Sequence, residues 1–283
     1  MNRRERKPLK NTTMADENTQ IEVTSDSIDA SLIFHVVFDV LAFLLYMHQQ
    51  IPSMLQDMTL QYEYLQTEHN ELEISLTQND LDVSSRRTNV GRKRDIKLEI
   101  RRSEKLMNSI SGLRTAFQLL LCAVPVVDNI IFVFGASPRR PQQVYEICFS
   151  SGSNDFLASE EITRTRMIEV VSRKVIRALI SKGVGSVSYS GPSKLFLLVK
   201  APVSFNMPLH FLPKREFQCG KKIVPCKLKL KSKNAHQEIT SSCSISDAVT
   251  GFHQQQIVSS DLVWFQCRHV IKGIALGNPT PEE

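Results

Sequence analysis

Hydrophobic residues recur at helical spacing in four stretches of the chain. From Ile28 to Leu45 they fill two adjacent helical stripes, which is typical of a helix in the middle of a fold. Pro52 then marks the end of this helix. The same 3.6-residue period predicts further helices over 53–69, 104–122 and 160–181.

Shorter apolar runs predict strands. NIIFVFG (129–135) and VYEICFS (144–150) flank SPRRPQQ, which predicts a hairpin with that sequence as its loop. KLFLLVKA (194–201) follows the fourth helical stretch. PCKLKLKSK (225–233) alternates lysine with apolar residues, a pattern typical of a guarded edge strand.

The run DLVWFQCRHVIKG (261–273) contains the only tryptophan of the protein, close to the C-terminus. Chain ends fray unless something ties them down. Because the pair Trp264 and Phe265 can bury a large apolar area, we predict that this end is docked onto the rest of the fold.

The order of these elements is three helices, a hairpin, one helix and then strands. It predicts an α+β fold with helices packed on one face of a mostly antiparallel sheet. Residues 1–25 are polar and without periodicity, so we expect a disordered tail. Residues 26–283 form a single domain in this interpretation, with a basic disordered loop at about 70–103.

The net charge of +6 is concentrated in two segments. Residues 84–102 hold eight Lys and Arg against Asp95 and Glu99, and residues 213–233 hold eight against Glu216. The first segment indicates nuclear targeting, contact with an acidic partner or only a solvated loop. It contains no aromatic residue, so nucleic acid is an unlikely partner in this interpretation. Six cysteines without a dense framework indicate a reducing compartment.

The sequence offers little catalytic chemistry. It contains no phosphate-binding loop, nucleophile elbow or metalloprotease motif. His35 and Asp39 stand four residues apart on the first helix, where a structural pair is more common than an acid/base pair. Cys219, Cys226 and His210 fit no standard zinc pattern. We therefore expect no catalytic residues, no metal and no cofactor, and a binding protein rather than an enzyme.

Two further patterns concern surfaces. The apolar run 31–47 is interrupted by His35 and Asp39, which favours a buried core helix over a membrane span. On the helix at 160–181, Ile176 and Ile180 stand among charged residues, as at a protein interface with an apolar centre and a polar rim. The alternative is that these two isoleucines only widen the core stripe.

Four stretches, taken in order, carry a family resemblance: LYMHQQIP (45–52), IIFVFGASPRRPQQVYEICFS (130–150), HFLPKREF (210–217) and DLVWFQCRHVIKG. Together they resemble the Comet-type adaptors of the spindle assembly checkpoint, which belong to the HORMA-fold group. The resemblance covers about residues 28–275.

The resemblance implies a HORMA-like fold, with three helices packed on a mostly antiparallel sheet. A C-terminal safety belt, here at about 202–275, would be locked closed across the sheet. The chain's own C-terminal segment, anchored by Trp264 and Phe265, would fill the slot in which relatives clasp a partner peptide.

The implied function is that of a non-catalytic adaptor. Such an adaptor binds the closed conformer of a mitotic-arrest-deficient HORMA checkpoint protein and presents it to a Pch-family AAA+ ATPase for remodelling, which silences the spindle assembly checkpoint. The same ATPase acts on HORMA proteins of the meiotic axis. Localisation to nucleus and cytoplasm, with kinetochores and spindle, would follow, and no membrane partner is implied.

The implied sites fall on three parts of the chain. The fourth helix and the end of the first would bind the checkpoint protein, through Arg173, Ile176, Arg177, Ile180, Met47, Gln49 and Gln50. Pro213 and Lys214 would dock the ATPase. Two alternatives stay open: an open-belt HORMA protein of chromosome axes that clasps a peptide, and a nucleic-acid-binding module that uses residues 84–102.

Overall fold

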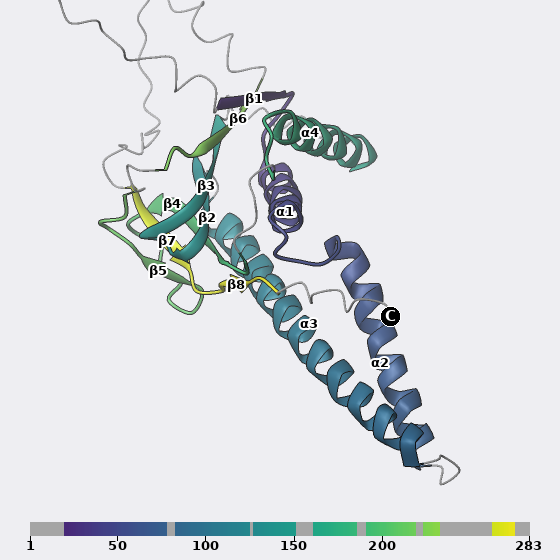
Figure 1. Ribbon diagram of the computed structural model, residues 1–283. Helices are drawn as coiled ribbons and strands as arrows, with labels where there is room; N and C mark the ends of the chain where they lie inside the picture. Colours follow the sequence, from purple (N-terminus) through teal and green to yellow (C-terminus); the bar gives the residue numbers. More distant parts are fainter. Residues whose placement is uncertain are drawn as a thin grey trace, which may run out of the picture.

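The computed structural model describes residues 20–77, 83–124, 127–150, 161–185, 191–218, 223–232 and 262–274 (Figure 1). The helices within these ranges are α1 (Ala30–Met47), α2 (Leu55–Thr77), α3 (Val83–Ala123) and α4 (Glu161–Ser181). The strands are β1 (Gln20–Ser25), β2 (Asn129–Ser137), β3 (Arg140–Ser150), β4 (Lys194–Pro202), β5 (Phe211–Pro213), β6 (Cys226–Ser232), β7 (Leu262–Cys267) and β8 (Ile271–Lys272).

One sheet contains all eight described strands, in the order β1-β6-β3-β2-β4-β7-β5, with β8 paired to β4. β6 runs parallel to both β1 and β3, and the other pairs are antiparallel. The protein is therefore an α+β protein with a mostly antiparallel sheet, as predicted.

β6 is flanked on both sides, so the prediction of an edge strand at 225–233 is wrong. Its alternation has another cause. Leu228 and Leu230 are buried in the main core, whereas the intervening lysines stand on the opposite face of the strand.

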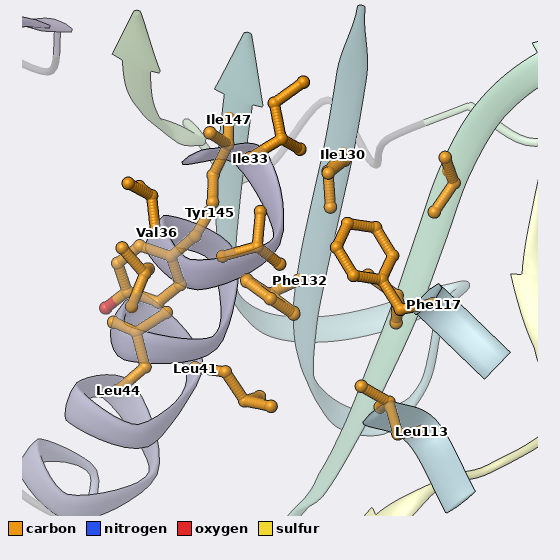
Figure 2. Packing of buried hydrophobic residues seen from close by; sticks show 14 of the residues in the cluster. Ile33, Val36, Leu41, Leu44, Leu113, Phe117, Ile130, Phe132, Tyr145 and Ile147 are labelled. Carbon is orange, nitrogen blue, oxygen red and sulfur yellow. The ribbon is translucent and has the colours of Figure 1, made fainter. Parts of the chain in front are cut away.

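The helix α1 lies at the centre of the core, as predicted. Asp29 caps its N-terminus, with the carboxylate accepting a hydrogen bond from the Leu32 backbone N–H at 2.7 Å. By length and composition α1 could cross a membrane. In the structure its apolar stripes pack against Phe132 and Tyr145 of the sheet and Phe117 of α3 (Figure 2), and eight of its residues are buried.

The prediction of a disordered loop at about 70–103 is wrong. α2 and α3 form a long helical hairpin that projects away from the sheet (Figure 1). Leu65 of α2 and Ile96 of α3 are buried in it, and the Arg92 and Lys93 side chains pair with carboxylates of α2. Two helices that pack only against each other need few apolar residues per turn, and their other positions can be charged. The apolar period is then too weak to predict the helix from the sequence.

Two smaller corrections concern strands. Residues 20–25, assigned to the disordered tail, form β1, in which Ile21 and Val23 are buried; residues 1–19 lie outside the described residues. SPRRPQQ is not a long loop, because β3 begins at Arg140. Gly135, with φ +152°, allows the close approach here, since a Cβ at this position would lie 2.5 Å from the Arg140 carbonyl oxygen.

The hairpin gives a direct test of this correction. We expect backbone amides between residues 84 and 103 to be protected from hydrogen exchange in the wild-type protein. Ile96→Asp should abolish that protection, because it places a charge in the seam. Leu98→Asp, at an exposed position of the same helix, should leave it intact. Rapid exchange of these amides in the wild-type protein would contradict the helical hairpin.

Candidate interaction site

Strand β7 is enclosed within the sheet. On one side it pairs with β4, with Val199 opposite Phe265 and Lys200 opposite Trp264. On the other side it pairs with β5, with Pro213 opposite Phe265. The Lys214 N–H adds a hydrogen bond of 2.7 Å to the Trp264 carbonyl. The C-terminal segment is therefore docked, as predicted, and both of its backbone edges are occupied.

The chain around β7 makes the enclosure possible. After β4 the chain continues to β5, which lies on the far side of β7. Residues 214–225 then connect β5 to β6, which lies near the opposite end of the strand order. The segment expected as a belt, about 202–275, thus contains β5 to β8, and its residues 233–261 lie outside the described residues.

The two aromatic residues of β7 point to opposite faces of the sheet. Phe265 is buried in the main core, edge-to-face with Phe205 at 5.0 Å between ring centroids. Trp264 packs on the other face against Phe217, at 5.9 Å, beside a second cluster that includes Phe196 and Leu198. Side chains on both faces therefore hold β7 in place, which is the anchoring expected for Trp264 and Phe265.

Gln50 fastens the end of the C-terminal segment. Its side-chain oxygen accepts a hydrogen bond from the Ser193 N–H at 2.7 Å, its side-chain amide donates to the His48 carbonyl at 2.7 Å, and its backbone carbonyl accepts from the Ile274 N–H at 2.8 Å. A Cβ on Gly273 would lie 2.1 Å from the Gln50 side-chain oxygen, so a larger residue there would displace the Gln50 amide from its hydrogen bonds.

Gln50 is 3% exposed, so its assignment to the partner surface is wrong. Two of its hydrogen-bond partners, Ser193 and Ile274, are more than 140 residues away in sequence, so no local pattern predicts them. The sequence signal for this contact is Gly273 followed by Ile274, because a glycine allows another segment to approach the backbone closely.

A second polar contact lies beside Gln50. The His48 imidazole and the Tyr145 hydroxyl are 2.6 Å apart in the core, and the Tyr145 hydroxyl donates to the Gln143 side-chain oxygen at 2.8 Å. Burial lowers the pKa of His48 to about 4. The imidazole is therefore neutral at physiological pH, and it joins the end of α1 to β3.

The outer face of α4 presents most of the predicted partner-binding residues. The Arg173 guanidinium is exposed and pairs with the Glu169 carboxylate at 3.0 Å, and Arg177 is also exposed. Ile180 is exposed, whereas Ile176 is half-buried and packs partly against the core. The alternative that the isoleucines widen the core stripe is therefore correct for Ile176. Ile180 stays a prediction of an interface residue.

The end of α1 lies beside the end of α4. Met47 is half-buried against Gly185, where an added Cβ would lie 2.5 Å from the Met47 terminal methyl. Gln49 is exposed, with φ 51° in the turn that follows α1. Met47 and Gln49 therefore share one region with the outer face of α4. Tyr46, which the sequence did not single out, adds an exposed aromatic ring on the last turn of α1.

The predicted ATPase-docking residues lie on the outermost strand beyond β7. Pro213 and Lys214 are exposed, and they sit where β5 covers the C-terminal strand. A partner that contacts them would touch the segment that encloses β7.

Compared with protein-family models and with curated proteins, the chain gives no significant match.

The remaining candidates for chemistry are not brought together. His35 and Asp39 are both exposed rather than set in the core. Cys219 of the candidate zinc set lies outside the described residues. Among the residues that the structure describes, no three His, Cys, Asp or Glu side chains form a group that could hold a metal.

The anchoring of β7 predicts a stability effect. Phe265→Ala should lower the free energy of unfolding by about 3–5 kcal/mol, because it leaves a cavity in the core next to Phe205. Leu209→Ala, at an exposed position close to β5, should change it little. Urea denaturation of both variants measures the difference, and a Phe265→Ala protein as stable as the wild type would contradict the docking of β7.

His48 predicts a pH dependence of stability. The imidazole of the unfolded chain titrates near 6.5. Because the folded pKa is about 4, the unfolded chain binds a proton that the folded protein does not as the pH falls from 6.5 to 4. Stability from this group is thus complete above 6.5 and decreases through that window, by roughly 3 kcal/mol in total.

The comparison of variants isolates this effect from other titrating groups. Urea denaturation between pH 7.5 and 4.5 should show a shallower loss for His48→Gln than for the wild type, whereas His35→Gln, at an exposed position, should follow the wild type. Parallel losses in wild type and His48→Gln would show that the buried imidazole does not cause the dependence.

Proposed function

We propose that this protein is a non-catalytic adaptor with a HORMA-like fold. Its partner is the closed conformer of a HORMA checkpoint protein, which it presents to a Pch-family AAA+ ATPase for remodelling. In this proposal the adaptor supplies recognition and the ATPase supplies the energy, so that the spindle assembly checkpoint is silenced, with a corresponding role in meiosis.

The observation that carries the proposal is the enclosure of β7 between β4 and β5. In a peptide-clasping protein a partner strand would need that position, with free N–H and C=O groups on the flanking strands. Here those groups already pair with the chain's own Trp264, Phe265 and Gln266. A self-filled slot favours the adaptor over the open-belt alternative.

The binding surface follows from what remains accessible. With the slot filled, the outer face of α4 exposes Ile180 beside the guanidinium groups of Arg173 and Arg177, and the last turn of α1 exposes Tyr46. Such an arrangement of an apolar or aromatic centre with an arginine rim is typical of protein interfaces. Pro213 and Lys214 lie on the sheet edge at β5, so a second partner could contact them separately.

Calorimetric titration of a purified closed checkpoint HORMA protein tests the proposal. We expect a complex with the wild-type chain. Ile180→Asp should weaken it by about 2–5 kcal/mol, because a charge would be buried without a partner at the interface centre. Ile180 is better suited to this test than Ile176, whose replacement would also disturb the core.

Ile74→Asp provides the matched control. Ile74 is 58% exposed on α2 and Ile180 is 55% exposed on α4. The same substitution therefore changes charge and solvation to a similar extent on a helix that projects away from α4 (Figure 1). If wild type and Ile180→Asp bind with equal affinity, α4 is not the interface. If the wild-type protein forms no complex at all, the proposed function is wrong.

A further inference from the structure

The hairpin helix α3 carries a basic face that the adaptor function does not use. Arg87, Arg94, Arg101 and Lys105 are exposed and recur at helical spacing, on the side of α3 opposite the buried Ile96. The eighteen residue steps from Arg87 to Lys105 span about 27 Å at 1.5 Å per residue. The face is therefore a straight row of cations on a helix that stands out from the body of the molecule (Figure 1).

A cavity on the α2 side of this face is lined by groups that donate hydrogen bonds. It has a volume of about 440 Å³ and is bounded by Gln66, His69, Asn70, Lys97, Ile100 and Arg101. Among the described residues no carboxylate lines it. The Nε2 atom of His69 is buried without a described hydrogen-bond partner. The cavity thus combines two cations, two amides and one unsatisfied imidazole nitrogen.

A second cavity lies on the other flank of α3, where the C-terminal segment crosses it. It has a volume of about 570 Å³ and is lined by Arg102, Lys105, Leu106, Asn108, Ser109, Val270, Lys272, Gly273 and Ile274. Its described lining likewise holds no carboxylate. The basic face is therefore bordered on both sides by hollows that suit an anion.

The acidic residues of α3 are set apart from this face. Asp95 and Glu99 line a different cavity, of about 340 Å³, together with Met58 and Leu65. Glu104 stands at the border of the basic face. The cations that turn toward α2, Arg92 and Lys93, are paired with its carboxylates. Charges are thus matched inside the hairpin and unmatched on its outer face.

We propose that this face binds the phosphate backbone of duplex nucleic acid without regard to sequence. Duplex DNA carries one negative charge per about 1.7 Å of its axis, so a 27 Å row of cations faces roughly eight base pairs. Arg, Lys, Asn, Gln and Ser are the side chains that donate to phosphate oxygens. This binding lies beyond the proposed adaptor function and places the adaptor on chromatin.

Other polyanions fit the face less well. Stacking on single strands needs aromatic rings, and α3 between Ser84 and Arg102 has none. Insertion into a membrane surface needs many large apolar side chains among the cations, and among the described exposed positions this face has only Val90 and Leu98. A flexible acidic peptide would lose conformational entropy along a rigid row, whereas a duplex is already stiff. The absence of aromatic rings therefore disfavours single-stranded nucleic acid but not duplex nucleic acid.

Fluorescence anisotropy with a labelled 20-base-pair DNA of arbitrary sequence tests the proposal on the full chain. Since log K falls with log salt at about −0.9 per phosphate neutralised, four to six contacts give a slope of roughly −4 to −5. Arg94→Glu with Arg101→Glu should weaken binding at least tenfold and make the slope shallower by about 2, to the same extent for unrelated sequences.

Arg139→Glu with Arg140→Glu is the matched control, because it changes two exposed arginines on the β2–β3 turn by the same charge. Its affinity should stay within about threefold of the wild type. Equal losses in both double variants would overturn the proposal, because attraction would then depend on net charge alone. Tighter binding of a poly-glutamate peptide or of anionic vesicles than of the duplex would also overturn it. Circular dichroism of each variant confirms that the helices remain folded.

Discussion

The pairing of β7 on both of its edges is the interaction on which the rest of the structure depends. β4 and β5 do not pair with each other; each pairs with the C-terminal strand between them. Buried backbone N–H and C=O groups need partners, so removal of β7 would leave both neighbours unsatisfied. The C-terminal strand β7 is therefore an interior strand of the sheet.

This arrangement decides which surfaces remain for partners. β5 is the edge strand beyond β7 at one end of the strand order, and β1 is the edge strand beyond β6 at the other. The strands between them pair on both sides, so contacts with partners fall mainly to side chains on helix faces. α4 presents the apolar Ile180 among arginines, and the outer face of α3 presents mainly cations. The first composition suits a folded protein and the second suits a polyanion.

The parts of this fold that the sequence predicted are those whose burial is nearly complete. α1, β2 and β4 have so many apolar residues that their runs stand out against any background. The first half of α3 was not predicted because Ile96 is the one buried residue among the side chains described there, and eight Lys and Arg dominate its composition. Gln50 was assigned to the surface because its hydrogen-bond partners, Ser193 and Ile274, are distant in sequence. When segments distant in sequence bury a residue, the pattern of its neighbouring residues does not predict that burial.

The two proposed surfaces lie on helices that are stabilised by different contacts. α4 packs through Val171, Val175 and Leu179 against the same core as α1 and the sheet. The outer part of the α2–α3 hairpin depends instead on Leu65, Ile96 and a few ion pairs at its own seam. Because exposed charge changes on α3 touch neither the core nor the enclosure of β7, loss of the basic face should leave α4 folded. The recognition of a protein partner and of a polyanion can therefore be separated by substitution, even though one chain carries both surfaces.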